Sequence, residues 1–305
     1  MAQLGAASVA GVGPCYRRPW PGAQRSHVAQ AHHPSHITHP ASPGSPCLAA
    51  EDWRHGDRVW RERPANSLRM TSDNTSPITD HPSPASLAPT RLIDSDAPAI
   101  QAYALLHAQG ATDRERAVAL YRAVRDGFRY DPYRIDLSPH GMTASTVLSD
   151  GFGWCVPKAA LLAAACRAAG IPARMGFADV RNHLSTQRMR DTMKTDLFLW
   201  HGYTDIWLDG QWRKATPAFN SELCDRFGLL PLEFDGIGDS IYHPFDKAGQ
   251  RHIEYVHQRG TFDDLPLDQI VSDYRTFYGN WLEGGANHSG LQAASFAIDV
   301  EKETR

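Results

Sequence analysis

The residue with the strongest chemical context in the sequence is Cys155, which lies between a glycine-rich loop and an apolar segment. We expect a buried helix over about residues 155–169, because alanine and leucine occupy nearly every face of it. A thiol in its first turn would lie beside unpaired N–H groups at the positive end of the helix dipole, which favours the thiolate. Gly151 and Gly153 would let the loop approach a substrate closely. The pattern predicts a nucleophile, with a structural core cysteine as the alternative.

The other cysteines have no comparable setting. Cys166 lies in the middle of the same helix and is predicted to fill the core, and Cys224 has no neighbouring residues that suggest chemistry. The five cysteines, which include Cys15 and Cys47, are odd in number and form no C-x-x-C pair. This excludes a disulfide framework and a cysteine-type zinc site, and it favours a reduced, cytoplasmic setting. No motif predicts a metal or a cofactor.

A thiol nucleophile needs a base, and the base needs a partner that orients it. His201 is the candidate base, because it lies in segment 197–208, where side chains alternate as in a strand. A core histidine is the alternative. Asp209-Gly210 then predicts a two-residue hairpin turn, with the returning strand over 211–220.

The register of that hairpin suggests which residues orient the imidazole. Counting outward from the turn places His201 opposite Ala218, so that Thr216 and Asn220 become its diagonal neighbours on the same face. Diagonal neighbours lie roughly 7–8 Å apart, within reach of an amide side chain but long for a hydroxyl. Asn220 is therefore the first choice as orienting residue and Thr216 the second, although Pro217 can interrupt the ladder.

Several elements are predicted to surround this pair. Thr112 and Glu115 form a capping box at the start of a helix that ends at Gly127. Further helices are predicted over 143–148 and 265–277, strands over 173–180 and 251–256, and a polar insertion loop over 181–196. Helices followed by strands indicate an α+β protein, with the Cys155 helix packed on an antiparallel sheet.

Three more residues are candidates near the nucleophile. Trp154 and Tyr130 could donate a hydrogen bond to an oxyanion, but a role as pocket wall is favoured for both. Lys158 lies one turn after Cys155, and its default place is the solvated surface of the helix. A cation at that position would also favour the thiolate.

Composition divides the chain into a catalytic-type domain and two ends. Twelve of the 21 prolines lie in residues 1–90, and this segment has no hydrophobic periodicity, so we expect it to be disordered. Met70 is a candidate native start, which would make residues 1–69 an accessory extension, and their cluster of four histidines is not expected to bind metal. The domain is predicted over 91–283, and a loose tail over 284–305.

From these residues the sequence resembles the transglutaminase-like superfamily. The motifs are Gly-Trp-Cys155 before an apolar helix, then Arg-Ala-Ala-Gly-Ile-Pro-Ala-Arg at 167–174, a strand with His201, and Gly-Gln-Trp212. They span about residues 113–220 and imply a papain-like fold with a Cys, His, Asp triad. The family usually has Asp-Pro-Thr after this tryptophan, whereas Thr216-Pro-Ala stands here. The threonine puts the third triad member in doubt, unless Asn220 replaces it.

Two functions follow from this pattern. The first is a thiol-dependent peptidase, amidase or acyltransferase that acts through an acyl-enzyme on a peptide or protein amide. The second is a catalytically inactive binding module that keeps the groove. A net charge of −3 gives no electrostatic case for nucleic acid or an anionic membrane as partner. No stretch approaches the roughly 18 apolar residues of a membrane helix. The oligomeric state is left open.

Overall fold

The computed structural model describes residues 81–182, 185–241, 253–279 and 294–304, all within the unit Asp73–Arg305. The elements in chain order are η1 (Pro84–Ser86), α1 (Pro98–His107), α2 (Asp113–Gly127), β1 (Arg129–Tyr130), α3 (Pro139–Met142), α4 (Ala144–Asp150), β2 (Phe152–Gly153), α5 (Cys155–Ala168), β3 (Ala173–Asn182), α6 (Gln187–Met193), β4 (Leu197–Leu208), β5 (Gln211–Ala215), α7 (Ser221–Phe227), β6 (Ile253–Phe262), α8 (Leu267–Tyr278) and α10 (Phe296–Glu303).

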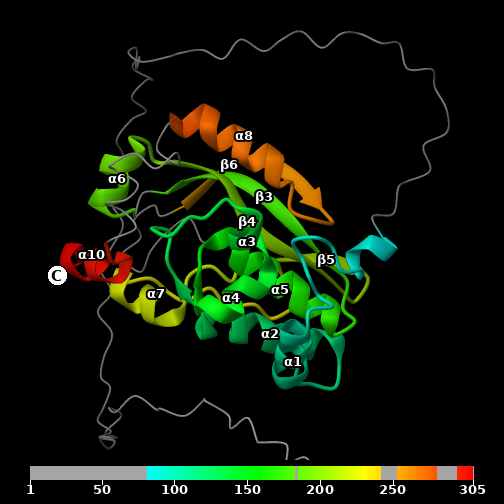
Figure 1. The fold of residues 1–305 in the computed structure, drawn as a ribbon. Coiled ribbons are helices and arrows are strands. Elements are labelled where there is room, and N and C mark those ends of the chain that lie inside the picture. Colours follow the sequence, from blue (N-terminus) through cyan, green and yellow to red (C-terminus); the bar gives the residue numbers. More distant parts are fainter. Residues whose placement is uncertain (1–80, 183–184, 242–252, 280–293, 305) are drawn as a thin grey trace, which may run out of the picture. The chain divides into compact units, whose positions relative to one another are not determined.

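The larger sheet is antiparallel, with the strand order β5-β4-β3-β6. Figure 1 shows α1, α2, α4 and α5 gathered on one side of these strands and α8 on the other. The predicted α+β class with a helix on an antiparallel sheet is therefore confirmed. The hairpin between β4 and β5 turns at Asp209 and Gly210, which both have positive φ (50° and 81°), as a primed two-residue turn requires.

The first turn of α5 packs directly against β4. Every residue from Cys155 to Arg167 is buried, as the apolar composition of this helix predicts. A Cβ added at Gly202 of β4 would lie only 3.0 Å from the Val156 Cα, so the absence of a side chain lets the helix and the strand meet. One turn later, the Thr204 hydroxyl donates a hydrogen bond to the Ala159 carbonyl at 2.8 Å.

A short parallel pair, β1 and β2, brings another segment to the same place. Tyr130 pairs with Gly153, two residues before the start of α5. The chain reaches β1 from α2, whose predicted capping box between Thr112 and Glu115 is present. The aromatic segment that begins at Phe128 is thereby placed beside the first turn of α5.

The structure corrects three expectations about segment boundaries. Region 181–196, expected as a polar loop, contains the end of β3 and helix α6, whose Met189 is buried. Region 284–305, expected as a loose tail, contains α10, whose buried Phe296 and Val300 give it a packed face. Described residues before position 91 also contact the predicted domain, since the Ala88 carbonyl accepts a 2.7 Å hydrogen bond from Arg167. Residues 1–80, including Met70 and the histidine cluster, lie outside the described residues.

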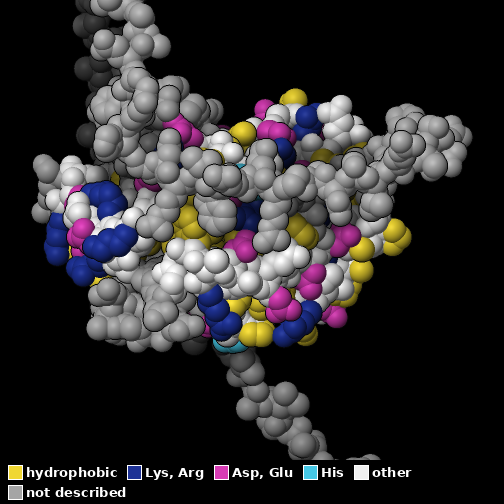
Figure 2. Space-filling model, turned by 90° about the horizontal axis from the view of Figure 1, so that it is seen from above, with side chains coloured by type: hydrophobic (Ala, Val, Ile, Leu, Met, Phe, Trp, Pro, Cys, Tyr) yellow, Lys and Arg dark blue, Asp and Glu magenta, His cyan; other side chains and the backbone are white. Residues whose placement is uncertain are grey.

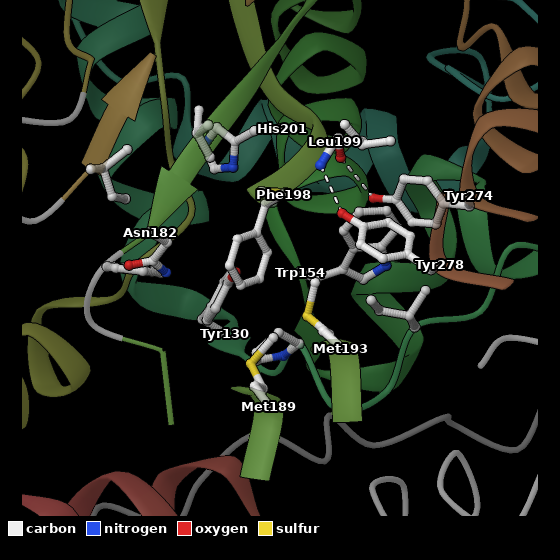
Figure 3. Close-up of a pocket in the computed structure, with 16 residues that line it drawn as sticks. Tyr130, Trp154, Asn182, Met189, Met193, Phe198, Leu199, His201, Tyr274 and Tyr278 are labelled. Carbon is white, nitrogen blue, oxygen red and sulfur yellow. Dashed lines mark hydrogen bonds between the residues drawn. The ribbon is translucent and has the colours of Figure 1, made fainter. Parts of the chain in front are cut away.

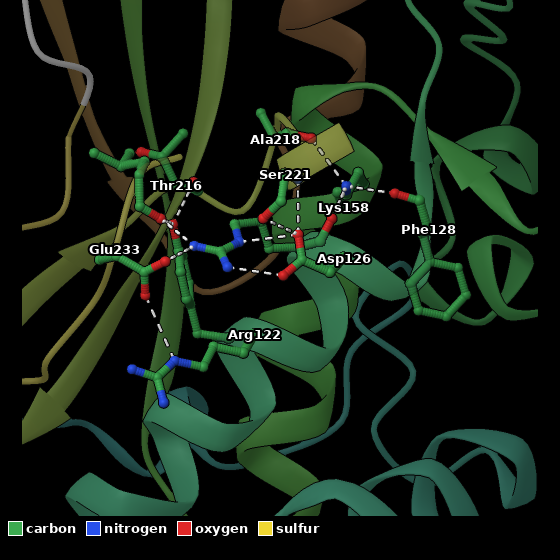
Figure 4. Close-up of polar contacts among 11 residues, drawn as sticks. Arg122, Asp126, Phe128, Lys158, Thr216, Ala218, Ser221 and Glu233 are labelled. Atoms are coloured by element: carbon green, nitrogen blue, oxygen red, sulfur yellow. Dashed lines mark hydrogen bonds and ion pairs between the residues drawn. The ribbon is translucent and has the colours of Figure 1, made fainter. Parts of the chain in front are cut away.

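Lys158 is buried rather than exposed, which corrects a further expectation. Its ammonium donates hydrogen bonds to the backbone carbonyls of Arg125, Phe128 and Ala218 at 2.8, 2.7 and 2.9 Å (Figure 4). Burial lowers its pKa to about 7. Three carbonyl acceptors, however, require three N–H donors, and only the ammonium form supplies them. Lys158 thus joins the end of α2 and the chain after β5 to α5.

Replacing Lys158 with methionine tests this connection. Lys158→Met keeps the length of the side chain but leaves three carbonyls without their donor, so we expect the free energy of unfolding to fall by about 3 kcal/mol or more. Urea denaturation measures the change. The control is Lys302→Met on the exposed surface of α10, which should change stability by less than about 0.5 kcal/mol. Equal effects of the two substitutions would contradict the role given to Lys158.

Candidate active site

Cys155 and His201 line one cavity of the described structure (Figure 3). Cys155 is the first residue of α5, and His201 lies on β4, one residue before the close contact at Gly202. Trp154 and Tyr130 also line this cavity. Two predicted site residues that lie 46 positions apart in the sequence are therefore brought to the same space by the packing of α5 on β4.

Burial and backbone donors have opposite effects on the Cys155 thiol. The side chain is buried, and burial raises its pKa to about 12, while the backbone N–H groups of Gly202, Val156 and Cys155 itself act to lower it. The helix start thus supplies the expected donors, but desolvation is the larger effect. In this closed arrangement the pKa of the Cys155 thiol is therefore raised by burial, whereas the sequence predicts that the helix start favours the thiolate.

His201 is also held in its neutral form. The residue is 6% exposed, and burial lowers its pKa to about 4. An imidazole that is neutral at pH 7 can accept a proton, which a base requires. Burial therefore favours a neutral thiol and a neutral imidazole in this cavity.

A β-bulge precedes His201 and is fixed by charged residues. Ala178 of β3 pairs with His201 and Val180 pairs with Phe198, so that Leu199 and Trp200 together lie opposite Asp179. Trp200 has a φ of 56°, which is rare for a bulky side chain and is typical of bulges near functional sites.

The strained backbone of Trp200 has three supports. The Asp179 carboxylate accepts a hydrogen bond from its backbone N–H at 3.0 Å, and the Asp273 carboxylate accepts one from its indole N–H at 2.8 Å. The guanidinium of Arg259 forms ion pairs with both carboxylates and lies 4.4 Å from the indole ring centroid. These contacts hold the backbone immediately before the candidate base.

The two candidate orienting residues lie outside the cavity lining. The hairpin pairs Leu208 with Gln211 as predicted, but the ladder ends at Ala215, and the Thr216 N–H donates to the Ser240 carbonyl at 3.1 Å. The expected pairing of His201 with Ala218 therefore does not form, and Pro217 follows immediately after the break. The Thr216 hydroxyl is buried and has no hydrogen-bond partner among the described residues.

Asn220 and Gly153 have contacts of their own. The Asn220 side-chain oxygen accepts a hydrogen bond from the Tyr130 N–H at 3.2 Å, so it holds the aromatic segment beside the cavity. Gly153 faces a different hollow, and its carbonyl accepts a 3.1 Å hydrogen bond from the Asp131 N–H. Both residues support the frame around the cavity.

Two groups of lining residues were not identified from the sequence. Tyr274 and Tyr278 come from α8, and Met189 and Met193 come from α6. The tyrosines recur at helical spacing, Tyr274 within the helix predicted over 265–277 and Tyr278 one residue after it, and this spacing is the available signal. The two methionines are four positions apart, as on one face of a helix, but the arginine and threonine residues around them give the segment the composition of a polar loop. Within the described ranges, no cluster of three or more His, Cys, Asp or Glu side chains could hold a metal ion.

Comparisons with known proteins give one family model and two similar solved structures. Residues 102–217 match the model of the transglutaminase-like superfamily, which confirms the resemblance predicted from the motifs. One similar solved structure is a candidate cysteine protease from Cytophaga hutchinsonii, with 18% identity and a TM-score of 0.38 over 62% of this chain and 50% of that one. Another is a candidate protease from Parabacteroides distasonis, with 20% identity and a TM-score of 0.31 over 43% and 25%. The chain thus spans half of the first and a quarter of the second. No curated protein matches.

Replacing Gly202 with alanine should move Cys155 of α5 away from His201 of β4. Gly202→Ala places a Cβ 3.0 Å from the Val156 Cα, so α5 must shift by a few tenths of an ångström. We expect a loss of about 1–2 kcal/mol of stability from overpacking and a roughly tenfold slower alkylation of Cys155. Gly238→Ala is the control, because a Cβ there meets no atom within 4 Å. The prediction fails if the two variants alkylate at the same rate.

Burial of a neutral His201 should make the protein sensitive to acid. The folded-state pKa of about 4 lies below the ordinary value of 6.5, so the unfolded state binds the extra proton as pH falls between these values. Stability should decrease by about 3 kcal/mol over that interval. His201→Gln removes the titrating group and should flatten this part of the curve. Urea denaturation from pH 7 to pH 4 measures it, and parallel curves for the two proteins would contradict a buried neutral imidazole.

Proposed function

We propose, from the premise that residues 102–217 belong to the transglutaminase-like superfamily, that this protein is a thiol-dependent amide hydrolase or acyltransferase. The observation that carries the proposal is the common cavity of Cys155, on the first turn of α5, and His201, on β4. The bulge at Trp200 and the contact at Gly202 are further support, because both constrain the backbone beside these two residues.

The neutral resting pair fits a reaction in which proton transfer accompanies attack. The Cys155 sulfur attacks the carbonyl carbon of the substrate while the thiol proton passes to His201. The N–H groups of the first turn of α5 stabilise the oxyanion of the tetrahedral intermediate. His201 then returns the proton to the leaving amine, and a thioester remains on Cys155. His201 next accepts a proton from water or from an acceptor amine, which attacks the thioester carbonyl. The acyl group leaves as the acid or the new amide, and the departing Cys155 sulfur takes the proton back from His201 to restore the thiol.

We propose that Thr216 is the third member of the site and orients the His201 imidazole. Its hydroxyl is buried without a hydrogen-bond partner among the described residues, whereas the side-chain oxygen of Asn220 is already bonded to Tyr130. In this proposal Asn220 holds the backbone of Tyr130, which lines the cavity. A hydroxyl is a weaker orienting group than the aspartate that is usual in the family, so we expect a slow enzyme.

The proposed substrate is a peptide or protein amide, and hydrolysis is favoured over transfer because the described residues include no recognisable amine site. On the face in Figure 2, basic side chains gather at the left of the view, and acidic side chains lie mostly toward the right. The net charge of −3 supports a partner other than nucleic acid. None of the described helices is both long enough and apolar enough to cross a membrane. A cytoplasmic location remains part of the proposal.

A binding module without catalysis is the second candidate. It is favoured by Thr216 at the usual position of aspartate and by the raised pKa of Cys155. Such a module would keep the cavity but would form no covalent intermediate. The two candidates therefore differ in one measurable species, the thioester.

Trapping of that thioester tests the proposal. We expect p-nitrophenyl acetate to acetylate Cys155, with a hydroxylamine-sensitive mass increase in the peptide that contains it. Cys155→Ala should abolish this species, and His201→Asn should slow its formation by about 100-fold or more, the usual contribution of a general base. Cys224→Ser, a change at a buried cysteine outside the cavity lining, is the control and should leave the rate unchanged. Absence of a thioester in the unmodified protein would favour the binding module.

A further inference from the structure

The cavity beside Cys155 has a wall of apolar side chains from separate elements. Met189 and Met193 lie one turn apart on α6, and Figure 3 shows both side chains directed into the cavity. Phe198 and Tyr130 lie across from them in the same view. Ile253, at the start of β6, is also part of the lining.

No described residue of this lining has a full charge at neutral pH. Of its 16 residues none is Lys, Arg, Asp or Glu, and His201 is neutral because burial lowers its pKa to about 4. The hydroxyls of Tyr274 and Tyr278 donate hydrogen bonds to the backbone carbonyls of Leu199 and Leu197, each at 3.0 Å. A carboxylate or ammonium group placed here would lose its hydration without gaining an ionic partner, which is strongly unfavourable.

Helix α6 is held in place by the C-terminal helix. The Asp299 carboxylate of α10 accepts hydrogen bonds from Arg188 of α6 at 2.7 Å and from Tyr133 at 3.0 Å. The Glu303 carboxylate accepts from the backbone N–H of Gln187 at 2.9 Å, at the first turn of α6. The two methionines therefore project from a supported helix, while their flexible thioethers can adapt to the shape of a ligand.

From the charge-free wall and the two methionines we propose that this cavity is the subsite for an uncharged, apolar side chain of the acyl donor. The free space is about 40 Å³, room for roughly three waters, or about 90 Å³ of liquid volume, similar to an aliphatic side chain of three or four carbons. The substrate class is thus an amide whose reacting residue is aliphatic. This inference rests on the proposed function, since it concerns the substrate of Cys155.

Alkylating reagents test the subsite without requiring turnover. The probes are two iodoacetamides of equal length, one with an N-butyl chain and one with an N-carboxyethyl chain, and peptide mapping measures the labelling rate of Cys155. We expect the butyl reagent to react at least about tenfold faster than the anionic reagent, a typical discrimination by an apolar pocket against a poorly matched group. Fully buried Cys166 gives the background rate.

A pair of variants assigns the preference to the cavity wall. Met193→Lys introduces a cation into the lining and should reduce or reverse the preference, whereas Gln187→Lys adds the same charge on the exposed side of α6 and should leave it unchanged. Met193→Leu should retain the preference if the lysine variant fails to fold.

The outcomes separate the two proposals. Equal labelling of Cys155 by both reagents, above the rate for Cys166, would overturn the apolar subsite and leave the thiol function standing. Labelling of Cys155 no faster than Cys166 by either reagent would overturn the proposed function itself, and the subsite with it. Identical preferences in Met193→Lys and in the unmodified protein would assign the selectivity to another surface and overturn the subsite.

Discussion

The first turn of α5 lies against β4 at Gly202, and the rest of the site depends on that contact. A helix start is a natural place for a nucleophile, because its N–H groups have no partners in the helix. In the proposed mechanism these groups act together with a base, and the candidate base, His201, is on the neighbouring strand. The missing side chain at Gly202 permits the approach, and the hydrogen bond between Thr204 and Ala159 fixes the next turn. Lys158 then joins two other chain segments to the same helix.

The close packing has an electrostatic consequence. Burial in this tightly packed site raises the pKa of Cys155 and lowers that of His201. The described lining of the cavity therefore has no charged group at rest, and in the proposed mechanism charge develops only as the thiol attacks the substrate carbonyl. Lys158, by contrast, keeps an ammonium buried because it has three carbonyl acceptors around it. Lys158 is thus a buried cation that joins segments of the frame, whereas the described lining of the cavity at the proposed site has no Lys, Arg, Asp or Glu side chain.

The sequence predicted the features that depend on local patterns. The capping box at Thr112, the hairpin at Asp209-Gly210 and the apolar helix after Cys155 each follow from short-range backbone chemistry, and each is present. The features it missed depend on contacts between distant segments. Lysine is usually a surface residue. The three carbonyl acceptors of Lys158 come from the end of α2 and from the chain after β5, which lie beside it only in the folded protein.

The same reason explains the errors at the edge of the site. Pairing arithmetic places Thr216 and Asn220 on the sheet beside His201, but the Thr216 N–H bonds to Ser240, a residue that no local pattern connects to it. The sequence of helix α6 predicts a loop because polar residues dominate it. Its two methionines can be recognised as lining residues only from the cavity, which is formed with distant segments.

The most direct test of the account is the ionisation state of the two candidate catalytic residues at rest. NMR chemical shifts of the Cys155 Cβ and of the His201 ring carbons, followed from about pH 5 to about pH 9, report the protonation of each group separately. Burial of both groups predicts a protonated thiol and a neutral imidazole across neutral pH, with no titration of His201 above about pH 5. A thiolate and an imidazolium present together at neutral pH would contradict the closely packed, desolvated site described above.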